Sequence, residues 1–267
     1  MKGLLLEGGR SSRMGKDKAS LILRDELSQH ERGLQLLGTV CDAAFTSSRE
    51  ASIGAITDIR ENAGPLAGLE AALAEDPASP WLLLACDLPL METCVLETLR
   101  AAYDETPLAF RNRSDGRAEP LCAIYPPDCR RPLQEWLDAG KFCARHFLES
   151  LSPRLLDLPE GHPFALDNAN TPEDLIELEY RLAGSPTEKR LSLLHFAQLR
   201  DQIGSAEQSH TTTCATAAGV FDEIRMAHSL KLKRTGLKVA VNGEFSSWDH
   251  LIADGDELVF IPPVSGG

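Results

Sequence analysis

Several features that would assign a protein to a class at once are missing from this sequence. It contains no run of 18 apolar residues, so we expect no membrane-spanning helix and no membrane partner. The apolar stretch at Leu4–Leu6 is too short for a secretory signal peptide, and Glu7 ends it. We find no internal repeat and no low-complexity tract. These absences favour an ordinary soluble globular chain.

Cysteine is present, but not in any pattern that would bind a metal or form a disulfide framework. The seven cysteines are scattered, their number is odd, and no Cys-x-x-Cys pair occurs. This argues against a zinc ribbon and against disulfide cross-links. We therefore predict a cytoplasmic location, and we expect each cysteine to be a small buried apolar residue.

Positive charge is scarce. The chain has 27 basic and 40 acidic side chains, a net charge of −13. Most of this excess lies in residues 1–185. An acidic body repels nucleic acid phosphates, so nucleic acid binding is disfavoured. Four basic residues between Arg10 and Lys18 stand out against this background.

The first part of the chain alternates short apolar runs with helical patterns. Gly3–Leu6 and Trp81–Cys86 are continuously apolar, which is typical of strands covered on both faces, as in a parallel sheet. Leu66–Glu75 and Thr93–Tyr103 have apolar residues at helical spacing. The alternation predicts βαβ units and a three-layer α/β sheet.

The pattern changes after Ala183–Thr187, a small, polar segment with helix breakers that we interpret as a linker. The chain of 267 residues is long enough for two domains. We predict a first domain over residues 1–183, a linker over 184–189 and an α+β domain over 190–267. The elements expected in the second domain are strands at Leu191–Phe196, Leu237–Val241 and Glu257–Ile261, a helix at Ala217–His228, and a tight turn at Asn242-Gly243.

A glycine-rich, basic segment follows the first predicted strand directly. Its glycines let backbone N–H groups approach an anion closely, and Arg13 and Lys18 supply positive charge. The segment is not a Walker A loop, because Lys16 is followed by Asp17, and it is not Gly-x-Gly-x-x-Gly. A solvated basic turn is the plain alternative.

The string Gly8–Lys18 resembles the signature of molybdenum cofactor guanylyltransferases, the MobA-like nucleotidyltransferases with a Rossmann-like three-layer α/β fold. The resemblance implies that the loop wraps the phosphates of GTP and that Arg13 and Lys18 bind them during catalysis. The other loop residues that it implicates in nucleotide binding are Gly8, Gly9, Ser11, Ser12 and Gly15. Related cytidylyltransferases usually have Ala-Gly in place of Gly8-Gly9 and lack the Asp-Lys-Ala ending, so guanine is favoured.

Two further segments resemble motifs of the same family. Gly64-Pro65-Leu66-Ala67-Gly68 is similar to its nucleotide-contacting turn, with Asp58 a few residues upstream. Ala85–Pro89 is similar to its metal site. Asp87 follows a buried strand, where ligands collect in open α/β sheets, and a carboxylate oxygen suits Mg²⁺. A helix N-cap or turn is the structural alternative for Asp87.

The resemblance extends over most of residues 1–182. Glu119–Tyr125 resembles a core strand of the family, and Asp167–Leu175 resembles its last motif. Asn168 and Asn170 are two residues apart, so in an extended segment they face the same side. The resemblance places them near the pterin and the nucleotide. Thr171-Pro172 is typical of a helix start, with Thr171 as N-cap.

Two positions depart from the family pattern. Glu7 stands where the family usually has alanine before the two glycines. A carboxylate there is expected to repel the phosphates of GTP, unless it faces the metal or forms a salt bridge. The Gly-x-Pro turn usual after Asp-Lys-Ala is replaced by Arg24–Leu27.

The second domain resembles the molybdopterin synthase small subunit, a ubiquitin-like sulfur carrier with a β-grasp fold. The matching segments are Leu194–Asp201, Val239–Gly243, Asp254–Glu257 and Phe260–Gly267. The resemblance implies that an E1-like enzyme adenylates Gly267, that a thiocarboxylate follows, and that the tail enters the large synthase subunit. Gly266 and Gly267 lack Cβ atoms and make a thin tail, and Pro262-Pro263 end the preceding strand.

Together the two resemblances imply two steps in molybdenum cofactor biosynthesis. The first domain would transfer GMP from GTP to molybdopterin with Mg²⁺, and the second would carry sulfur. A molybdopterin cytidylyltransferase or a sugar-phosphate nucleotidyltransferase is the nearer alternative. A first domain that has lost catalysis and acts as a scaffold for the sulfur carrier is an alternative of another class, suggested by Glu7.

Overall fold

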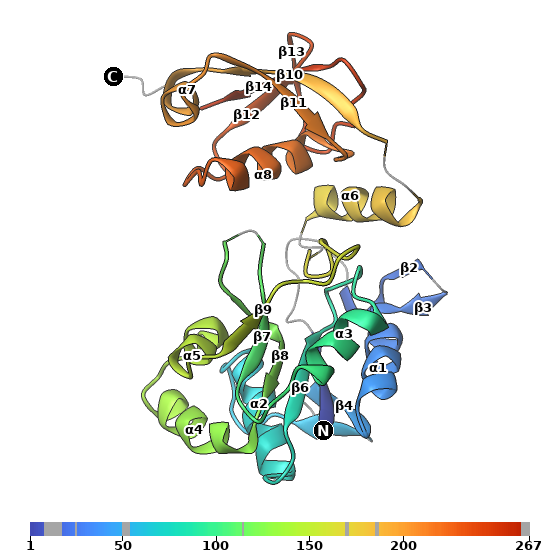
Figure 1. Cartoon of the computed structure of the whole chain (residues 1–267), viewed down its shortest axis with the longest axis vertical. Coiled ribbons are helices and arrows are strands. Elements are labelled where there is room, and N and C mark those ends of the chain that lie inside the picture. The colour runs from blue at the N-terminus through green and yellow to red at the C-terminus, as the bar shows by residue number, and fades with distance from the viewer. Residues whose placement is uncertain are drawn as a thin grey trace. The chain divides into compact units, whose positions relative to one another are not determined.

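The computed structural model describes residues 1–7, 18–24, 26–49, 54–113, 115–168, 171–184 and 187–262, with Lys18, Arg24 and Pro172 described by their backbone only. The chain divides into two compact units, Met1–Asn168 and Ala169–Gly267 (Figure 1). Each unit has a sheet and a hydrophobic core of its own.

A seven-stranded sheet forms the centre of the first unit, in the order β5-β4-β1-β6-β8-β7-β9. Four neighbouring strands, β5, β4, β1 and β6, are parallel, whereas β8 runs antiparallel to both β6 and β7. The bounds are β1 (Lys2–Leu6), β4 (Ala43–Ser48), β5 (Ala55–Thr57), β6 (Trp81–Ala85), β7 (Leu108–Arg111), β8 (Ala118–Tyr125) and β9 (Arg154–Leu156). The predicted α/β class is confirmed, but the sheet is mixed rather than wholly parallel.

Helices cover both faces of this sheet (Figure 1). On one face α1 (Gln29–Val40) and α3 (Thr93–Ala101) share a hydrophobic core with the strands. On the other face lie α2 (Pro65–Glu75), α4 (Arg130–Asp138) and α5 (Ala144–Ser150). Two short strands, β2 (Ile22–Arg24) and β3 (Leu27–Ser28), pair before α1. The expected three layers are therefore present.

The continuous apolar runs are explained by burial on both faces. All five residues of β6 are buried. Trp81 and Leu83 pack into the core beside α2, whereas Leu82 and Leu84 pack into the core beside α1 and α3. In β1, Leu4 and Leu5 are divided between the two cores in the same way. Side chains that alternate between two apolar layers leave no polar position in the strand.

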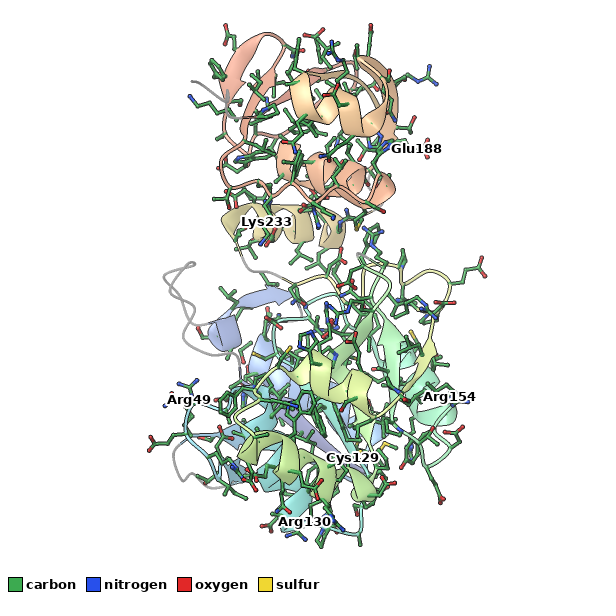
Figure 2. All side chains as sticks on the ribbon, turned by 90° about the vertical axis from the view of Figure 1, so that its left-hand side faces the viewer. Arg49, Cys129, Arg130, Arg154, Glu188 and Lys233 are labelled. Carbon is green, nitrogen blue, oxygen red and sulfur yellow. The ribbon has the colours of Figure 1, made fainter. Side chains whose placement is uncertain are left out.

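The cysteines are free thiols, and five of them are buried. Cys129, labelled in Figure 2, ends the 3-10 turn Pro127–Cys129 just before α4. Burial raises the pKa of its thiol to about 12. Cys94 and Cys143 are exposed, so the expectation that every cysteine is buried is wrong for these two. Both lie at or beside the first turn of a helix, where the turn faces solvent.

A five-stranded sheet crossed by one long helix makes the second unit, in the order β11-β10-β14-β12-β13. The central strands β10 and β14 are parallel and the other pairs are antiparallel, as in a β-grasp fold. The bounds are β10 (Lys189–His195), α7 (Ala197–Ile203), β11 (Glu207–Thr212), α8 (Ala217–Ala227), β12 (Lys238–Val241), β13 (Glu244–Ser246) and β14 (Glu257–Ile261). Asn242 and Gly243 have φ of 52° and 83° and form the predicted tight turn.

An additional helix, α6 (Pro172–Leu182), belongs to the second unit. It begins with the predicted cap: the Thr171 hydroxyl accepts a hydrogen bond from Asp174 N, and the Asp174 carboxylate accepts one from Thr171 N. Glu177 Oε2 accepts hydrogen bonds from Ala215 N at 2.8 Å and Thr216 N at 3.2 Å, at the start of α8. The compact units therefore divide before α6, whereas the linker predicted from the sequence lies after it. The predicted domain bounds, residues 1–183 and 190–267, stay a prediction.

None of the helices among the described residues combines the length and the apolar character that a membrane span requires.

The contact between α6 and α8 gives a first prediction. Replacing Glu177 by alanine removes the acceptor of two backbone N–H groups and the 3.0 Å ion-pair partner of Arg181, which is nearly buried. We expect the second unit to lose about 1–3 kcal/mol, the usual cost of unsatisfied buried donors. Hydrogen exchange of the α8 amides would measure this loss. Glu179→Ala, an exposed change on the same helix, should leave exchange unchanged; equal effects of both changes would contradict the prediction.

A buried histidine gives a second prediction. His195, at the end of β10, is 2% exposed, and burial lowers its pKa below 6.5 against the opposing effect of the Gln208 side chain. Below pH 6.5 the unfolded chain therefore takes up a proton more readily than the folded one, and the stability of the second unit should fall as the pH drops. Denaturant unfolding at a series of pH values should show a weaker fall in His195→Gln. The control is His250→Gln, an exposed change, which should lose stability with falling pH as the wild type does. If His195→Gln loses as much stability as this control, burial of His195 is not the cause.

Candidate functional site

The carboxyl ends of two neighbouring parallel strands, β1 and β6, define the site. Leu6 pairs with Ala85, and Cys86 N donates a hydrogen bond to Leu6 O at 3.1 Å. After β1 the chain passes through α1 to β4 on one side, and after β6 it passes through α3 to β7 and β8 on the other. Open α/β sheets bind ligands at such a topological switch point, where the connections from two neighbouring strands run in opposite directions along the sheet. Glu7 follows β1 at this edge, and Asp87 follows β6.

Asp87 is half-buried in the turn that leaves β6. It lies after the buried strand, where the sequence placed it, and its role as a metal ligand stays a prediction. Among the residues that the structure describes, no three carboxylate, histidine or cysteine side chains form a metal cluster. Mg²⁺ is commonly held by one or two carboxylates together with substrate phosphates and water. A single aspartate at the edge of the sheet therefore fits a metal that is completed by a nucleotide.

The Gly64–Gly68 segment forms the start of α2 and reaches the same edge. Gly64 is the N-cap with φ of 60°, a conformation that favours glycine, and Pro65 opens the helix. A Cβ on Gly68 would lie 2.4 Å from Ser47 Oγ and 3.1 Å from a Leu6 methyl group. Gly68 therefore lets the first turn of α2 lie against the ends of β1 and β4. The Leu66 side chain is fully buried, so only its backbone could contact a nucleotide.

Asp58 lies just after β5 and is tied to the neighbouring strand. Its carboxylate accepts a hydrogen bond from Ser47 Oγ at 2.7 Å, and its backbone N donates to Ser48 O at 2.8 Å. Burial raises the pKa of Asp58, and the hydrogen bond from Ser47 opposes this shift. Since Ser47 also contacts the Gly68 position, the structure brings Asp58 and the start of α2 to one corner of the sheet.

Glu7 makes an ion pair at this edge. Its Oε1 lies 2.7 Å from Nδ1 of His30, in the first turn of α1. Among the described residues, His30 therefore lies at salt-bridge distance from Glu7, and the pair is ionic when the imidazole is protonated. No sequence motif identified His30 as a site residue. A single histidine in an amphipathic helix is usually an ordinary surface residue, so it gives no functional signal.

Two other polar residues of α1 were also missed from the sequence. Gln29 and Arg32 are only 4% and 7% exposed and line a small cavity beside Ala85 and Cys86. Arg32 Nη2 donates to Met91 O at 2.5 Å and lies 3.7 Å from the Glu92 carboxylate. Arg32 therefore holds the segment that follows Asp87. Only the pairing of β1 with β6 brings α1 to this segment, so no local pattern predicts the contact.

The segment before Asn168 packs on the same loop. Ala165 and Leu166 are buried in one core with Cys86, Leu88 and Met91. The Cys94 thiol lies 3.2 Å from Nε2 of His162, and the Arg113 guanidinium stacks 4.3 Å from the ring centroid of Phe164. Asn168, the exposed last residue of the unit, comes two residues after Leu166, which packs on the segment that follows Asp87.

Several predicted site residues lie outside the described part of the chain. They are Gly8, Gly9, Ser11, Ser12, Arg13, Gly15, Asn170, Gly266 and Gly267, together with the side chain of Lys18. The Lys18 backbone starts the 3-10 turn Lys18–Ser20. The roles of these residues remain predictions. The structure does bring together the ends of β1 and β6, where loop residues 8–17 begin, and the start of α2.

Comparison with protein families gives two matches along the chain. The model described as a MobA-like NTP transferase domain matches residues 3–155, and that of the ThiS family matches residues 193–267. The first match begins within β1 and includes the start of α2 and Asp87. The second begins within β10 and extends to Gly267.

Individual proteins agree with these families. The chain is 31% identical over 183 residues to a "Molybdenum cofactor biosynthesis bifunctional protein" of Synechocystis, which covers 64% of this chain and 52% of that protein, so the chain spans about half the length of this relative. It is 32% identical over 199 residues to a "Probable molybdenum cofactor guanylyltransferase" of Trichormus variabilis, covering 67% of this chain and 90% of that protein.

A solved structure supports the fold of the first unit. "Molybdopterin-guanine dinucleotide biosynthesis protein A" from Archaeoglobus fulgidus matches with a TM-score of 0.57 and 24% identity, covering 68% of this chain and 99% of that one. At this identity the likeness concerns the fold alone. The model of the MobA-like NTP transferase domain matches more than half of the chain, and the chain belongs to that family, with a ThiS-family domain at residues 193–267.

Proposed function

We propose that the first unit transfers GMP from GTP to molybdopterin with the help of Mg²⁺, and that the second unit is a sulfur carrier for molybdopterin synthase. The observation that supports the first part most directly is the edge formed by β1 and β6. There the carboxyl ends of β1 and β6 lie side by side, the start of α2 packs on Leu6 and Ser47, and Asp87 follows β6. The names of the relatives, which are guanylyltransferases of the molybdenum cofactor, point to the same reaction.

The phosphates of GTP would lie between the loop over residues 8–17 and the first turn of α2. The unpaired N–H groups of a helix start and the positive end of its dipole favour an anion. Arg13 and Lys18 would add two positive charges in a unit that is otherwise acidic. The nearby Gly64 conformation and the close contact at Gly68 keep this helix start against the sheet.

The transfer itself needs no protein nucleophile. The terminal phosphate of molybdopterin attacks the α-phosphorus of GTP, a new P–O bond forms, and the bond to pyrophosphate breaks. Arg13 and Lys18 hold the phosphates in line and stabilise the charge of the departing pyrophosphate. Asp87 would hold Mg²⁺, which when bound neutralises phosphate charge. Arg32 keeps the segment after Asp87 in place through Met91 O.

Two alternatives to the guanylyltransferase are open. One is an enzyme that uses another base, and the other is a first unit that has lost catalysis. A cytidylyltransferase would use the same edge of the sheet with another base contact. A scaffold without catalysis is suggested by the carboxylate of Glu7. Its Oε1 lies 2.7 Å from His30 Nδ1, so a group that can donate a hydrogen bond, or a positive charge when protonated, is within reach of it.

Base choice is the direct test of the proposed reaction. We expect GTP to bind the full chain more tightly than CTP in the presence of Mg²⁺, because Gly8-Gly9 and Asp17–Ala19 follow the guanylyl pattern. Isothermal titration with both nucleotides would measure this difference. CTP binding as tight as that of GTP would refute the guanine assignment, and the absence of binding by either would favour the scaffold.

The metal ligand is tested by Asp87→Asn. The change removes one ligand charge near the phosphates while keeping the size of the side chain, and it should lower Mg²⁺-dependent turnover by on the order of a hundredfold. The measurements are the transfer rate and the Mg²⁺ dependence of GTP binding. Asp128→Asn, an exposed change before α4, is the matched control and should keep wild-type rates. Asp87→Asn at the wild-type rate would rule Asp87 out as the ligand.

The second unit is proposed to carry sulfur on its terminal glycine. Its central strand β14 ends at Ile261, and the chain then continues through Pro262 into the tail that ends in Gly266-Gly267. An E1-like enzyme would join the terminal carboxylate to AMP with release of pyrophosphate. A sulfur donor would then displace AMP and leave a thiocarboxylate, which the large subunit of molybdopterin synthase would use.

The tail gives the sharpest prediction for this unit. The mixed anhydride can form only on a free carboxylate at the end of the chain, so one extra residue after Gly267 should abolish charging. Residues 263–267 follow the last strand, so the extension should not alter thermal unfolding. Intact mass after incubation with an activating enzyme and ATP should show adenylate or sulfur on the native protein only. If the extended protein is charged as well, the carrier proposal fails.

A further inference from the structure

The ion pair between Glu7 and His30 is a feature for which the proposed reaction gives no reason. Glu7 is the last residue before the loop over residues 8–17, and the family usually has an uncharged alanine there. Its Oε1 lies 2.7 Å from His30 Nδ1, and the two side chains are 42% and 31% exposed. A half-exposed carboxylate at the phosphate end of the sheet would repel a triphosphate if it were unpaired.

Both partners are held in place by regular structure. The backbone of Leu6 is paired with Ser47 on one side and with Ala85 on the other, which fixes the direction in which Glu7 leaves β1. His30 lies in the first turn of α1, whose start is closed by a capping box. Ser28 Oγ accepts from Glu31 N at 3.2 Å, and the Glu31 carboxylate accepts from Ser28 N at 2.9 Å.

Among the described residues of this turn, the charged groups of Glu31 and Arg32 have partners of their own. The hydrogen bonds from Ser28 lower the pKa of Glu31 and keep its carboxylate at the cap. Arg32 is directed to Met91 O and the Glu92 carboxylate. Within the described parts of the chain, His30 is the cationic or hydrogen-donating group that lies at ion-pair distance from Glu7. An imidazole can donate from Nδ1, and it adds a positive charge when protonated.

We propose that His30 is a positioning residue for nucleotide binding, which compensates the Glu7 carboxylate and directs it away from the phosphates. The inference rests on the proposed binding of GTP at this edge. The inference predicts that His30 affects GTP binding only when Glu7 is present. Without Glu7, the histidine has no carboxylate to hold, and its loss should have little effect on the nucleotide.

A double-mutant cycle on the full chain tests this dependence. The dissociation constant of GTP with Mg²⁺ is measured by isothermal titration for the wild type, Glu7→Ala, His30→Gln and the double variant. We expect His30→Gln to weaken binding about tenfold, which corresponds to about 1.4 kcal/mol. Glu7→Ala and the double variant should both bind within about twofold of the wild type. His30→Lys, which places a permanent positive charge at this position, should rescue most of the affinity.

Controls separate this role from a structural one. His146→Gln, an exposed change on α5 on the opposite face of the sheet, should leave GTP binding unchanged. Thermal unfolding should be the same for all variants, because the pair is half-exposed and exposed ion pairs contribute little stability.

Three results would overturn the inference. If His30→Gln weakens binding equally with and without Glu7, or has no effect, the compensation does not exist and the proposed function still stands. If Glu7→Ala alone weakens GTP binding, Glu7 is itself a ligand of the nucleotide or the metal. If the wild type does not bind GTP, the proposed function fails and the inference fails with it.

Discussion

The parallel pairing of β1 with β6 is the constraint on which the first unit depends. Both strands are buried on two faces, so their side chains must alternate between two apolar layers. With every interior position apolar, polar residues can appear only where the strands end. The connections from these two strands diverge, and the backbone bond from Cys86 N to Leu6 O keeps their ends together. Glu7 and Asp87 therefore follow neighbouring strand ends, and the close approach of Gly68 to Leu6 and Ser47 brings the start of α2 to the same edge.

The distribution of charge at this edge is unusual for a proposed phosphate site. Three carboxylates, of Glu7, Asp58 and Asp87, lie at the ends of the strands in a chain that is already acidic. Glu7 has an ion-pair partner, and Asp58 accepts a hydrogen bond from Ser47. Asp87 follows the central strand β6. The proposed function assigns Mg²⁺ to this third carboxylate, because the other two already have neighbouring groups that can donate to them.

The second unit shows how a helix from one sequence motif can become part of another fold. Asp167–Leu175 resembles the last motif of the nucleotidyltransferase family and includes the first turn of α6, yet α6 packs on α8. The Glu177 carboxylate accepts hydrogen bonds from backbone N–H groups at the start of α8 that would otherwise be unsatisfied. It also forms an ion pair with Arg181. Asp174 serves both as a capping residue of α6 and as the ion-pair partner of Arg234. The fold unit and the family motif therefore end at different residues.

The sequence by itself determined the class of both units, several of their central elements and the family. Continuous apolar runs identified β1 and β6, helical spacing identified α2 and α3, and Asn242-Gly243 identified the hairpin, because each signal is local and arises from backbone geometry or from burial. The position of Asp87 at a strand end could be predicted for the same reason. Only the tertiary structure decided that β8 is antiparallel, that α6 joins the second unit, and that Glu7 meets His30 and Arg32 meets Met91. These contacts join residues that are far apart in the chain, and their energies depend on distance and burial, which no local pattern contains.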